Sequence, residues 1–192
     1  MDGFVLVVGN GAWEDPDMVL QLVEDADFVI ALDGAADRFD GWDIVVGDMD
    51  SIEDPSPHKA CSNQENSDLS KALEQYEVDA VVGVEGGRLD HAIGAFTSLF
   101  ENQSNAILYY DGWRACIVTE EGLNIDLESG VKCSVMPFGK VSKVTLTGCE
   151  YSLDNEDLNS GTRGIGNSAL GGEINISHQG GDLLFIWEAN AL

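Results

Sequence analysis

Apolar runs that end beside a glycine and an acidic residue recur through the first half of the chain, and this pattern constrains the fold more than any other feature. The runs at residues 28–32, 45–46 and 81–82 are followed by Asp33, Asp48 and Glu85, each of which neighbours a glycine. Short continuous apolar runs closed by glycine are typical of buried parallel strands that turn into loops. Because the carboxyl ends of parallel strands share one edge of a sheet, the pattern predicts acidic side chains gathered along that edge.

Strands and helices alternate in the predicted order of the first part. We expect strands at residues 4–8, 28–32, 43–46, 79–84 and 105–110, and helices at 15–25, 67–76 and 89–100. The third helix would carry Leu89, Ile93, Phe96 and Leu99 on one apolar face. This alternation predicts an α/β domain with a mainly parallel sheet, right-handed crossovers and polar loops at the carboxyl ends of the strands.

The pattern of apolar and polar residues changes after Gly112. Short runs with polar alternation occur at residues 115–119, 123–127, 132–136, 141–146, 173–177 and 183–187, separated by turns rich in Gly, Ser and Asn. Regularly spaced short strands without a convincing helix indicate an antiparallel sandwich or barrel, and we favour a sandwich. We therefore expect an α/β domain at residues 1–112 and an all-β antiparallel domain at residues 113–192.

The charge of the chain restricts its partners. The formal net charge is -26, from 35 acidic and 9 basic residues. Nucleic-acid binding through phosphate neutralisation needs clustered Lys and Arg, so we exclude it. A polyanionic substrate would have to be admitted by a metal ion and a few placed cations. The excess of carboxylates also suits a salt-rich cytoplasm, where ions screen self-repulsion, although an ordinary acidic protein is an equally open interpretation.

The cysteines and the apolar segments indicate a cytoplasmic protein. The four cysteines, Cys61, Cys116, Cys133 and Cys149, form no C-x-x-C pair and lie in or beside apolar runs. Buried free thiols in a reducing compartment are the favoured interpretation. The apolar run near the amino terminus is too short for a signal sequence, and no stretch approaches the roughly 20 apolar residues of a membrane span.

The segment Gly47-Asp48-Met49-Asp50-Ser51 is a candidate metal site. Residues two positions apart share a face of an extended chain, so Asp48 and Asp50 could both ligate one Mg²⁺. The alternative is a turn that uses aspartate for capping and solvation.

Two of the few cations fall inside acidic motifs. Asp68 opens a predicted helix and Lys71 lies about one turn further on the same side. In Gly86-Gly87-Arg88-Leu89-Asp90-His91, the glycines would let backbone amides approach a phosphate that Arg88 could clamp. A surface ion pair in the first motif and a glycine-rich turn with a capping aspartate in the second are the plainer alternatives.

Taken together, these motifs indicate phosphoryl-type transfer. Several carboxylates, a magnesium ion, one lysine and one arginine are what such chemistry requires, because its catalysis is mainly positioning and charge stabilisation. The chain has no G-x-x-x-x-G-K-[ST] segment, which excludes a P-loop kinase, and Gly9-Asn10-Gly11 is not a dinucleotide-binding fingerprint.

The chain resembles the thiamine pyrophosphokinase family in segments that follow the family's order and span nearly the whole sequence. In the first part these segments are Asp33-Gly34-Ala35-Ala36-Asp37, Gly47-Asp48-Met49-Asp50-Ser51, Gln64 with Ser67-Asp68-Leu69-Ser70-Lys71-Ala72-Leu73, and Gly86-Gly87-Arg88-Leu89-Asp90-His91. In the second part they are residues 148–153 and Ser160-Gly161-Thr162-Arg163-Gly164-Ile165-Gly166-Asn167. The combination is highly specific, although no segment is specific alone.

The resemblance implies an enzyme that transfers the pyrophosphoryl group of ATP to the hydroxyl of thiamine, giving thiamine diphosphate and AMP. It implies an α/β domain followed by a β-sandwich, a Mg²⁺ cofactor, and a homodimer whose active sites lie between subunits. The cationic thiazolium ring of thiamine would also suit an acidic cleft, since a nearby carboxylate attracts it.

The resemblance also assigns roles to individual residues. The carboxylates expected to bind Mg²⁺ and substrate are Asp48, Asp50 and Asp68. Asp90 is expected to be either a further ligand or the base that receives the hydroxyl proton. The residues expected to contact ATP are Asp33, Gly34, Lys71, Gly87, Arg88 and His91. Gln64 and Asn167 are expected to contact thiamine.

Three positions depart from the family pattern. Ala35 stands where a second glycine is usual, Ala95 replaces a common asparagine, and Gly166 replaces a serine before Asn167. The last two departures bear on substrate contacts and leave two alternatives open: a pyrophosphokinase for another heterocyclic alcohol such as a hydroxymethylpterin, or a non-catalytic thiamine- or nucleotide-binding protein. The complete set of carboxylates and cations argues against the non-catalytic alternative.

Overall fold

The computed structural model describes residues 3–54 and 65–189, so Cys61 and Gln64 lie outside the described residues. The chain divides into two compact units, Met1–Asp111 and Gly112–Leu192, called here the N-terminal and C-terminal units. The expected fold class is confirmed: the N-terminal unit is α/β with parallel strands, and the C-terminal unit consists of antiparallel sheets.

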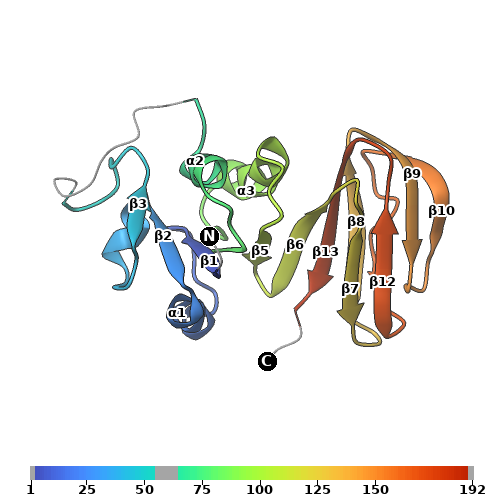
Figure 1. The fold of residues 1–192 in the computed structure, drawn as a ribbon, viewed down its shortest axis with the longest axis horizontal. Coiled ribbons are helices and arrows are strands. Elements are labelled where there is room, and N and C mark those ends of the chain that lie inside the picture. Colours follow the sequence, from blue (N-terminus) through green and yellow to red (C-terminus); the bar gives the residue numbers. More distant parts are fainter. Residues whose placement is uncertain (1–2, 55–64, 190–192) are drawn as a thin grey trace. The chain divides into compact units, whose positions relative to one another are not determined.

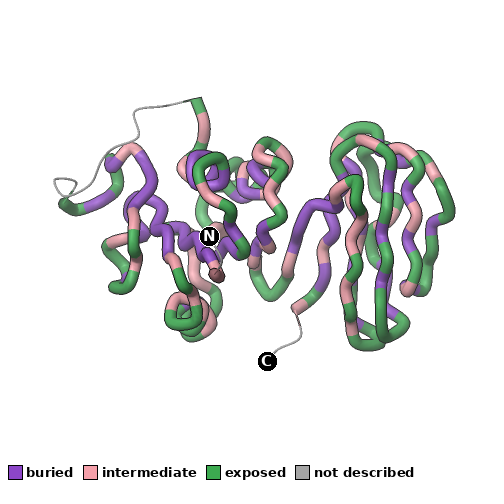
Figure 2. Tube along the Cα trace, viewed as in Figure 1, coloured by how far each residue is buried: buried purple, intermediate pink, exposed green. Residues whose placement is uncertain are grey.

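The N-terminal unit is built on a parallel sheet with strand order β5-β4-β1-β2-β3. Its strands are β1 (Val5–Val8), β2 (Phe28–Leu32), β3 (Ile44–Val46), β4 (Ala80–Val82) and β5 (Ile107–Tyr110). The central strands are buried along their length, which is why they read as continuous apolar runs (Figure 2). Helices cover both faces, with α2 and α3 on one side and α1 on the other (Figure 1).

Each helix of the N-terminal unit begins at a recognisable local signal. Helix α1 (Pro16–Asp25) follows the N-cap Asp15, whose side chain accepts a hydrogen bond from the backbone N–H of Met18. Helix α2 (Asp68–Gln75) follows the N-cap Ser67, and α3 (Leu89–Glu101) begins after Arg88. A short 3₁₀ helix, η1 (Asp33–Asp37), comes directly after β2.

The prediction that Leu89 and Ile93 belong to the buried face of α3 is wrong. Leu89 is 75% exposed and Ile93 is 53% exposed, whereas Ala92, Ala95, Ser98 and Leu99 are buried. The helix has apolar residues on two adjacent stripes, and the stripe with small residues faces inward because it allows close packing against α2, where the hydroxyls of Ser98 and Ser67 lie 3.4 Å apart. Phe96 packs on Tyr110 with ring centroids 5.4 Å apart.

The strand order creates a crevice at the carboxyl ends of β1 and β4. From β1 the chain proceeds to β2 and β3 on one side, and it then crosses to β4 and β5 on the other. The connections that follow β1 and β4 therefore lead to opposite sides of the sheet, and ligands of open α/β sheets bind at such a switch point. The two loops also touch each other: the backbone N–H groups of Gly9 and Gly11 donate to the carbonyls of Val82 and Gly83 at 2.8 and 2.7 Å.

The C-terminal unit consists of two antiparallel sheets with strand orders β11-β8-β13-β6 and β10-β9-β12-β7. Its strands are β6 (Trp113–Val118), β7 (Leu123–Leu127), β8 (Lys132–Phe138), β9 (Lys140–Thr147), β10 (Leu153–Asn159), β11 (Asn167–Ser168), β12 (Gly172–Ser177) and β13 (Asp182–Glu188). Burial alternates along strands such as β8 and β9, as expected where one face of a sheet packs on a core. Strands β10 and β11 were not predicted.

The described cysteines agree with the expectation of buried free thiols. Cys116, Cys133 and Cys149 are free and buried. The sulfur atoms of Cys133 and Cys149 are 3.6 Å apart, well beyond the roughly 2.05 Å of a disulfide bond. Among the described residues, no helix is both long and apolar enough to cross a membrane.

Candidate active site

A cavity of about 670 Å³ opens at the carboxyl edge of the parallel sheet in the N-terminal unit. This volume lies within the range of small-molecule sites. The structure gathers the following predicted site residues in its lining: Asp33, Gly34, Asp48, Asp50, Asp68, Lys71, Gly87, Arg88, Asp90 and His91. Gln64 lies outside the described residues. Asn167 belongs to strand β11 of the C-terminal unit and is not among the residues that line this cavity.

Three carboxylates form the acidic end of the cavity. Asp33, Asp48 and Asp50 each place one carboxylate oxygen within 4.8 Å of the others. Asp33 is only 6% exposed; its Oδ2 accepts a hydrogen bond from the backbone N–H of Ser51, and its Oδ1 is buried without a hydrogen-bond partner among the described residues. Burial raises the pKa of Asp33, and the neighbouring carboxylates of Asp50 and Asp68 raise it further, although the hydrogen bond from the N–H of Ser51 acts in the opposite direction.

The backbone around these carboxylates is shaped to bring them together. Asp33 has a φ of 42° and Met49 a φ of 64°, both in the left-handed region that non-glycine residues seldom adopt. Gly47 needs to be glycine, because an added Cβ would lie 2.9 Å from the Cβ of Asp33. Strain of this kind persists where surrounding structure enforces it, and it often marks functional sites.

The cluster of three carboxylates, Asp33, Asp48 and Asp50, is suited to bind a hard divalent cation. Such ions prefer oxygen ligands, and a buried carboxylate oxygen without a partner is a costly group that a cation would satisfy. The composition of the group differs from the expected set, because it includes Asp33, expected on the nucleotide side. Asp68 and Asp90 form ion pairs and are not among these three carboxylates, although a Cβ added to Gly47 would lie 3.2 Å from Oδ2 of Asp68 as well as 2.9 Å from the Cβ of Asp33. Their metal-binding roles stay predictions.

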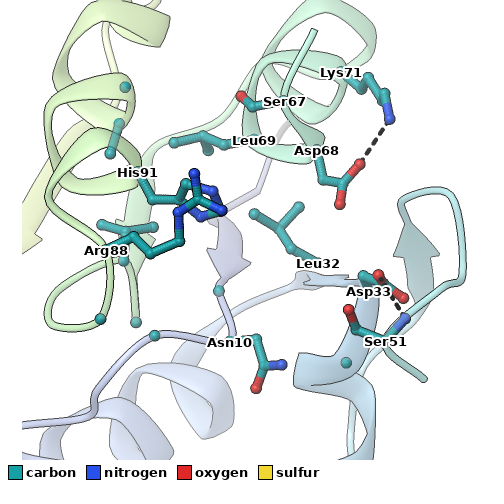
Figure 3. Close-up of a pocket in the computed structure, with 18 of the residues that line it drawn as sticks. Asn10, Leu32, Asp33, Ser51, Ser67, Asp68, Leu69, Lys71, Arg88 and His91 are labelled. Carbon is teal, nitrogen blue, oxygen red and sulfur yellow. Dashed lines mark hydrogen bonds and ion pairs between the residues drawn. The ribbon is translucent and has the colours of Figure 1, made fainter. Parts of the chain in front are cut away.

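Lys71 and Asp68 form a partly buried ion pair on α2. The Nζ atom of Lys71 donates to Oδ1 of Asp68 at 2.7 Å, and Lys71 is only 4% exposed (Figure 3). The pair is positioned by the N-cap, because the Oγ of Ser67 accepts a hydrogen bond from the backbone N–H of Ser70. A buried ammonium group held beside a cavity is suited to an anionic ligand.

Arg88 and Asp90 form a second ion pair on the exposed rim. The Nε and Nη2 atoms of Arg88 donate to the two carboxylate oxygens of Asp90 at 3.0 and 2.5 Å. The guanidinium group thereby lowers the pKa of Asp90 to about 2. Gly86 and Gly87 precede the pair with φ values of 72° and 67°, which glycine adopts without strain.

Three further residues border the cavity or its loops although they were not predicted as site residues. Asn10 and Ser51 line the cavity, and Glu85 is buried between the β1 and β4 loops with its Oε2 lacking a partner among the described residues. Burial raises the pKa of Glu85. The signal for Asn10 was available, since it follows the first apolar run and a glycine in the same pattern as the acidic residues.

The structure accounts for two of the departures from the family pattern. Ala35 is not among the described residues with positive φ, so the missing glycine causes no backbone strain there. Gly166 has a φ of 79°, which favours glycine over serine. Its neighbour Asn167 is buried, and its side chain accepts from the N–H and donates to the carbonyl of Tyr151 at 3.0 and 2.7 Å.

The fold and the cavity define a class: an α/β enzyme whose sheet edge presents clustered carboxylates and two cations, as in metal-assisted phosphoryl transfer. The model of the thiamin pyrophosphokinase catalytic domain matches residues 19–110, and the model of the thiamin pyrophosphokinase vitamin B1 binding domain matches residues 119–181. The chain belongs to the thiamin pyrophosphokinase family and carries both of its domains.

Solved structures share the fold at low sequence identity. Thiamine pyrophosphokinase from Bacillus subtilis is 22% identical with a TM-score of 0.77, covering 97% of this chain and 100% of that one. The enzyme from Geobacillus thermodenitrificans is 21% identical with a TM-score of 0.79 and covers 98% of each chain. Yeast thiamin pyrophosphokinase is 14% identical with a TM-score of 0.73, covering 98% of this chain and 87% of that one. The search of curated protein sequences found no significant match.

Proposed function

We propose that this enzyme transfers the pyrophosphoryl group of ATP to the hydroxyl of thiamine in the cavity of its N-terminal unit, releasing AMP. The observation that supports this most is the buried Oδ1 of Asp33, which has no hydrogen-bond partner in the described part of the chain and belongs to a group of three carboxylates beside two cations in a thiamin pyrophosphokinase catalytic domain. Carboxylates alone would repel a polyphosphate, so the site calls for a cation to admit one.

Asp33, Asp48 and Asp50 would hold Mg²⁺. The ion, when bound, neutralises phosphate charge and orients the phosphate oxygens. Lys71 would add a fixed positive charge from α2, and its burial means that this charge is weakly screened by solvent.

The rim pair gives Arg88 and Asp90 linked roles. A phosphate that binds Arg88 competes with Asp90 for the guanidinium group. Once Asp90 loses these hydrogen bonds, its pKa rises from about 2 towards its ordinary value, and it becomes a better acceptor for the hydroxyl proton of the acceptor alcohol. The cavity's negative charge would attract the thiazolium ring at the same time.

Other expectations from the resemblance belong to the same proposal. Gln64 and Asn167 would contact thiamine, and His91 would support the phosphate end of ATP. The enzyme would act as a homodimer with active sites between subunits, and it would work in the cytoplasm, which the free buried cysteines support.

One observation favours a second candidate acceptor. Ala95 lines the cavity where asparagine is common in the family, which removes a polar contact to the acceptor. A hydroxymethylpterin or another heterocyclic alcohol would then be the acceptor in the same reaction.

The direct test incubates purified protein with Mg²⁺, ATP and either thiamine or hydroxymethylpterin, and it quantifies AMP and the diphosphate product. We expect AMP and thiamine diphosphate in equal amounts. If AMP forms only with the pterin, the acceptor is the pterin and not thiamine. Formation of ADP would show single-phosphoryl transfer and refute the proposed reaction.

A further inference from the structure

The loop Gly9-Asn10-Gly11 forms one side of the switch-point crevice, opposite the glycine-rich loop that carries Arg88. We propose that Asn10 is a nucleotide-binding residue whose side-chain amide N–H donates to a phosphate oxygen of ATP. This inference rests on the proposed use of the cavity for ATP. Asn10 precedes the segment that matches the catalytic-domain model, so the family match assigns it no role.

The backbone of this loop is held rigidly. The N–H of Ala12 donates to the carbonyl of Glu85 at 2.6 Å, in addition to the bonds that Gly9 and Gly11 make to the end of β4. A Cβ added to Gly9 or Gly11 would lie 2.5 Å from the carbonyl oxygen of Gly83 or Glu85, so the close approach requires glycine on both sides of Asn10. Asn10 is the residue between these two glycines, so it is the residue of this tight segment that offers a side chain.

The side chain of Asn10 reaches the acidic end of the cavity. A Cβ added to Gly34 would lie 2.6 Å from Nδ2 of Asn10 and 2.7 Å from the carbonyl oxygen of Ser51, so both groups border Gly34, next to Asp33. Figure 3 shows Asn10 across the pocket from Asp68 and Lys71. Asn10 is exposed to the cavity, and its side chain makes no hydrogen bond with the described part of the chain.

The position and charge of Asn10 suit a polyphosphate. A polyphosphate that extends from the three clustered carboxylates to Arg88 would pass the loop after β1. Figure 3 shows Asn10 of this loop between Asp33 on one side and Arg88 on the other. Lys71 and Arg88 are already in ion pairs with carboxylates, whereas the uncharged amide of Asn10 forms no ion pair. A neutral donor therefore keeps its N–H groups available for phosphate.

The test compares the wild type with Asn10→Ala, Asn10→Asp and the control Asn105→Ala. Asn105 is exposed and lies just before β5, at the opposite edge of the same sheet. Binding of α,β-methylene-ATP with Mg²⁺ is measured by calorimetry, since this analogue resists cleavage of the bond that pyrophosphoryl transfer breaks. The KM values for ATP and thiamine, kcat and the thermal midpoint are measured on the same proteins.

We expect Asn10→Ala to weaken analogue binding by about 10-fold to 100-fold, the range for a hydrogen bond to a charged group. Asn10→Asp should weaken it more, because a carboxylate repels phosphate. The KM for ATP should rise, while the KM for thiamine and the thermal midpoint stay at the values of Asn105→Ala. A purely structural role would instead lower the midpoint and change both KM values together.

The outcomes separate this inference from the proposed function. Analogue binding by Asn10→Ala equal to that of Asn105→Ala overturns the role of Asn10, even if the wild type makes thiamine diphosphate. Weakened analogue binding in a protein that makes no diphosphate from thiamine supports Asn10 and refutes the proposed acceptor. A wild type that neither binds the analogue nor forms AMP from ATP refutes both. Should Asn10→Ala not fold, Asn10→Asp, of nearly unchanged size, carries the test.

Discussion

Asp33 combines a left-handed backbone, near-complete burial and a carboxylate oxygen without a partner among the described residues. Each of these features costs stability in a protein without a bound cation. They occur together at one residue beside two other carboxylates, so the cost is concentrated where a metal ion would reverse it.

Replacement of Asp33 by asparagine should therefore stabilise the metal-free protein at neutral pH. Burial raises the pKa of Asp33, so its contribution to stability is present below the unfolded pKa of about 3.9 and is lost as the pH rises through the folded pKa. At pH 7 the ionised side chain opposes folding. Asp33→Asn should raise the thermal midpoint in EDTA by about 2–4 °C for each kcal/mol relieved, and the gain should vanish below about pH 4.

Asp126→Asn is the matched control, because Asp126 is exposed on β7. It should leave the midpoint unchanged at both pH values. A midpoint of Asp33→Asn that is lower than wild type at pH 7 would show that the charge of Asp33 is compensated in the metal-free state.

Asp50→Asn should abolish turnover and leave the fold intact. The side chain can still accept the hydrogen bond from the Oγ of Ser51, but it loses the negative charge beside Asp33 and Asp48. We expect kcat to fall by at least about 100-fold, the scale of removing one electrostatic catalytic group. AMP production at a near-wild-type rate would remove Asp50 from the metal site.

At the scale of the elements, helix α2 combines a side-chain N-cap, Ser67, with three residues of its first turn that line the cavity, Asp68, Leu69 and Lys71. Ser67→Ala removes the acceptor for the N–H of Ser70 at 3.1 Å and should lower the free energy of unfolding by about 0.5–2 kcal/mol. Urea unfolding measures this difference at constant m-value. Ser67→Thr should retain most of the stability, and equal losses for Ala and Thr would mean that packing against Ser98, rather than capping, is what matters.

For the molecule as a whole, the net charge of -26 should make stability depend on salt. Raising KCl from 0.1 M to 1 M shortens the screening length from about 10 Å to about 3 Å and weakens repulsion among surface carboxylates. The thermal midpoint should rise by about 2–4 °C for each kcal/mol of repulsion removed.

The same KCl series near pH 4 provides the control, since the sequence pI is about 4.1 and little net repulsion is left there to be screened. A midpoint that stays flat between 0.1 M and 1 M KCl would favour the interpretation of an ordinary acidic protein over adaptation to a salt-rich cytoplasm.

Local sequence signals predicted the N-terminal elements well. Strand β2 occupies the expected residues 28–32, and α1 and α2 begin within one residue of the expected starts at residues 15 and 67. These features depend on a few consecutive residues, because a cap or a buried strand is encoded by neighbours in the chain. The grouping of acidic loops at one sheet edge followed from the parallel order of the strands.

Features that depend on distant partners escaped prediction. Strand β10 has the polar sequence LDNEDLN and pairs with β9 at the edge of its sheet with register shifts, so no apolar alternation marks it. The prediction of which face of α3 is buried was wrong for Leu89 and Ile93, because packing against α2 decides which of the two apolar stripes faces inward. The metal-binding roles of Asp48, Asp50, Asp68 and Asp90 and the thiamine contacts of Gln64 and Asn167 stay predictions.

The amino-acid order alone was enough to establish the α/β and all-β halves, the family, and the acidic and cationic residues that could serve a phosphate, because these depend on periodicity and on motifs of adjacent residues. Folding in three dimensions established which carboxylates stand together. Asp33 joins Asp48 and Asp50, while Asp68 and Asp90 are held by Lys71 and Arg88. Those groupings depend on strand order, backbone conformation and burial, and none of these is a property of neighbouring residues.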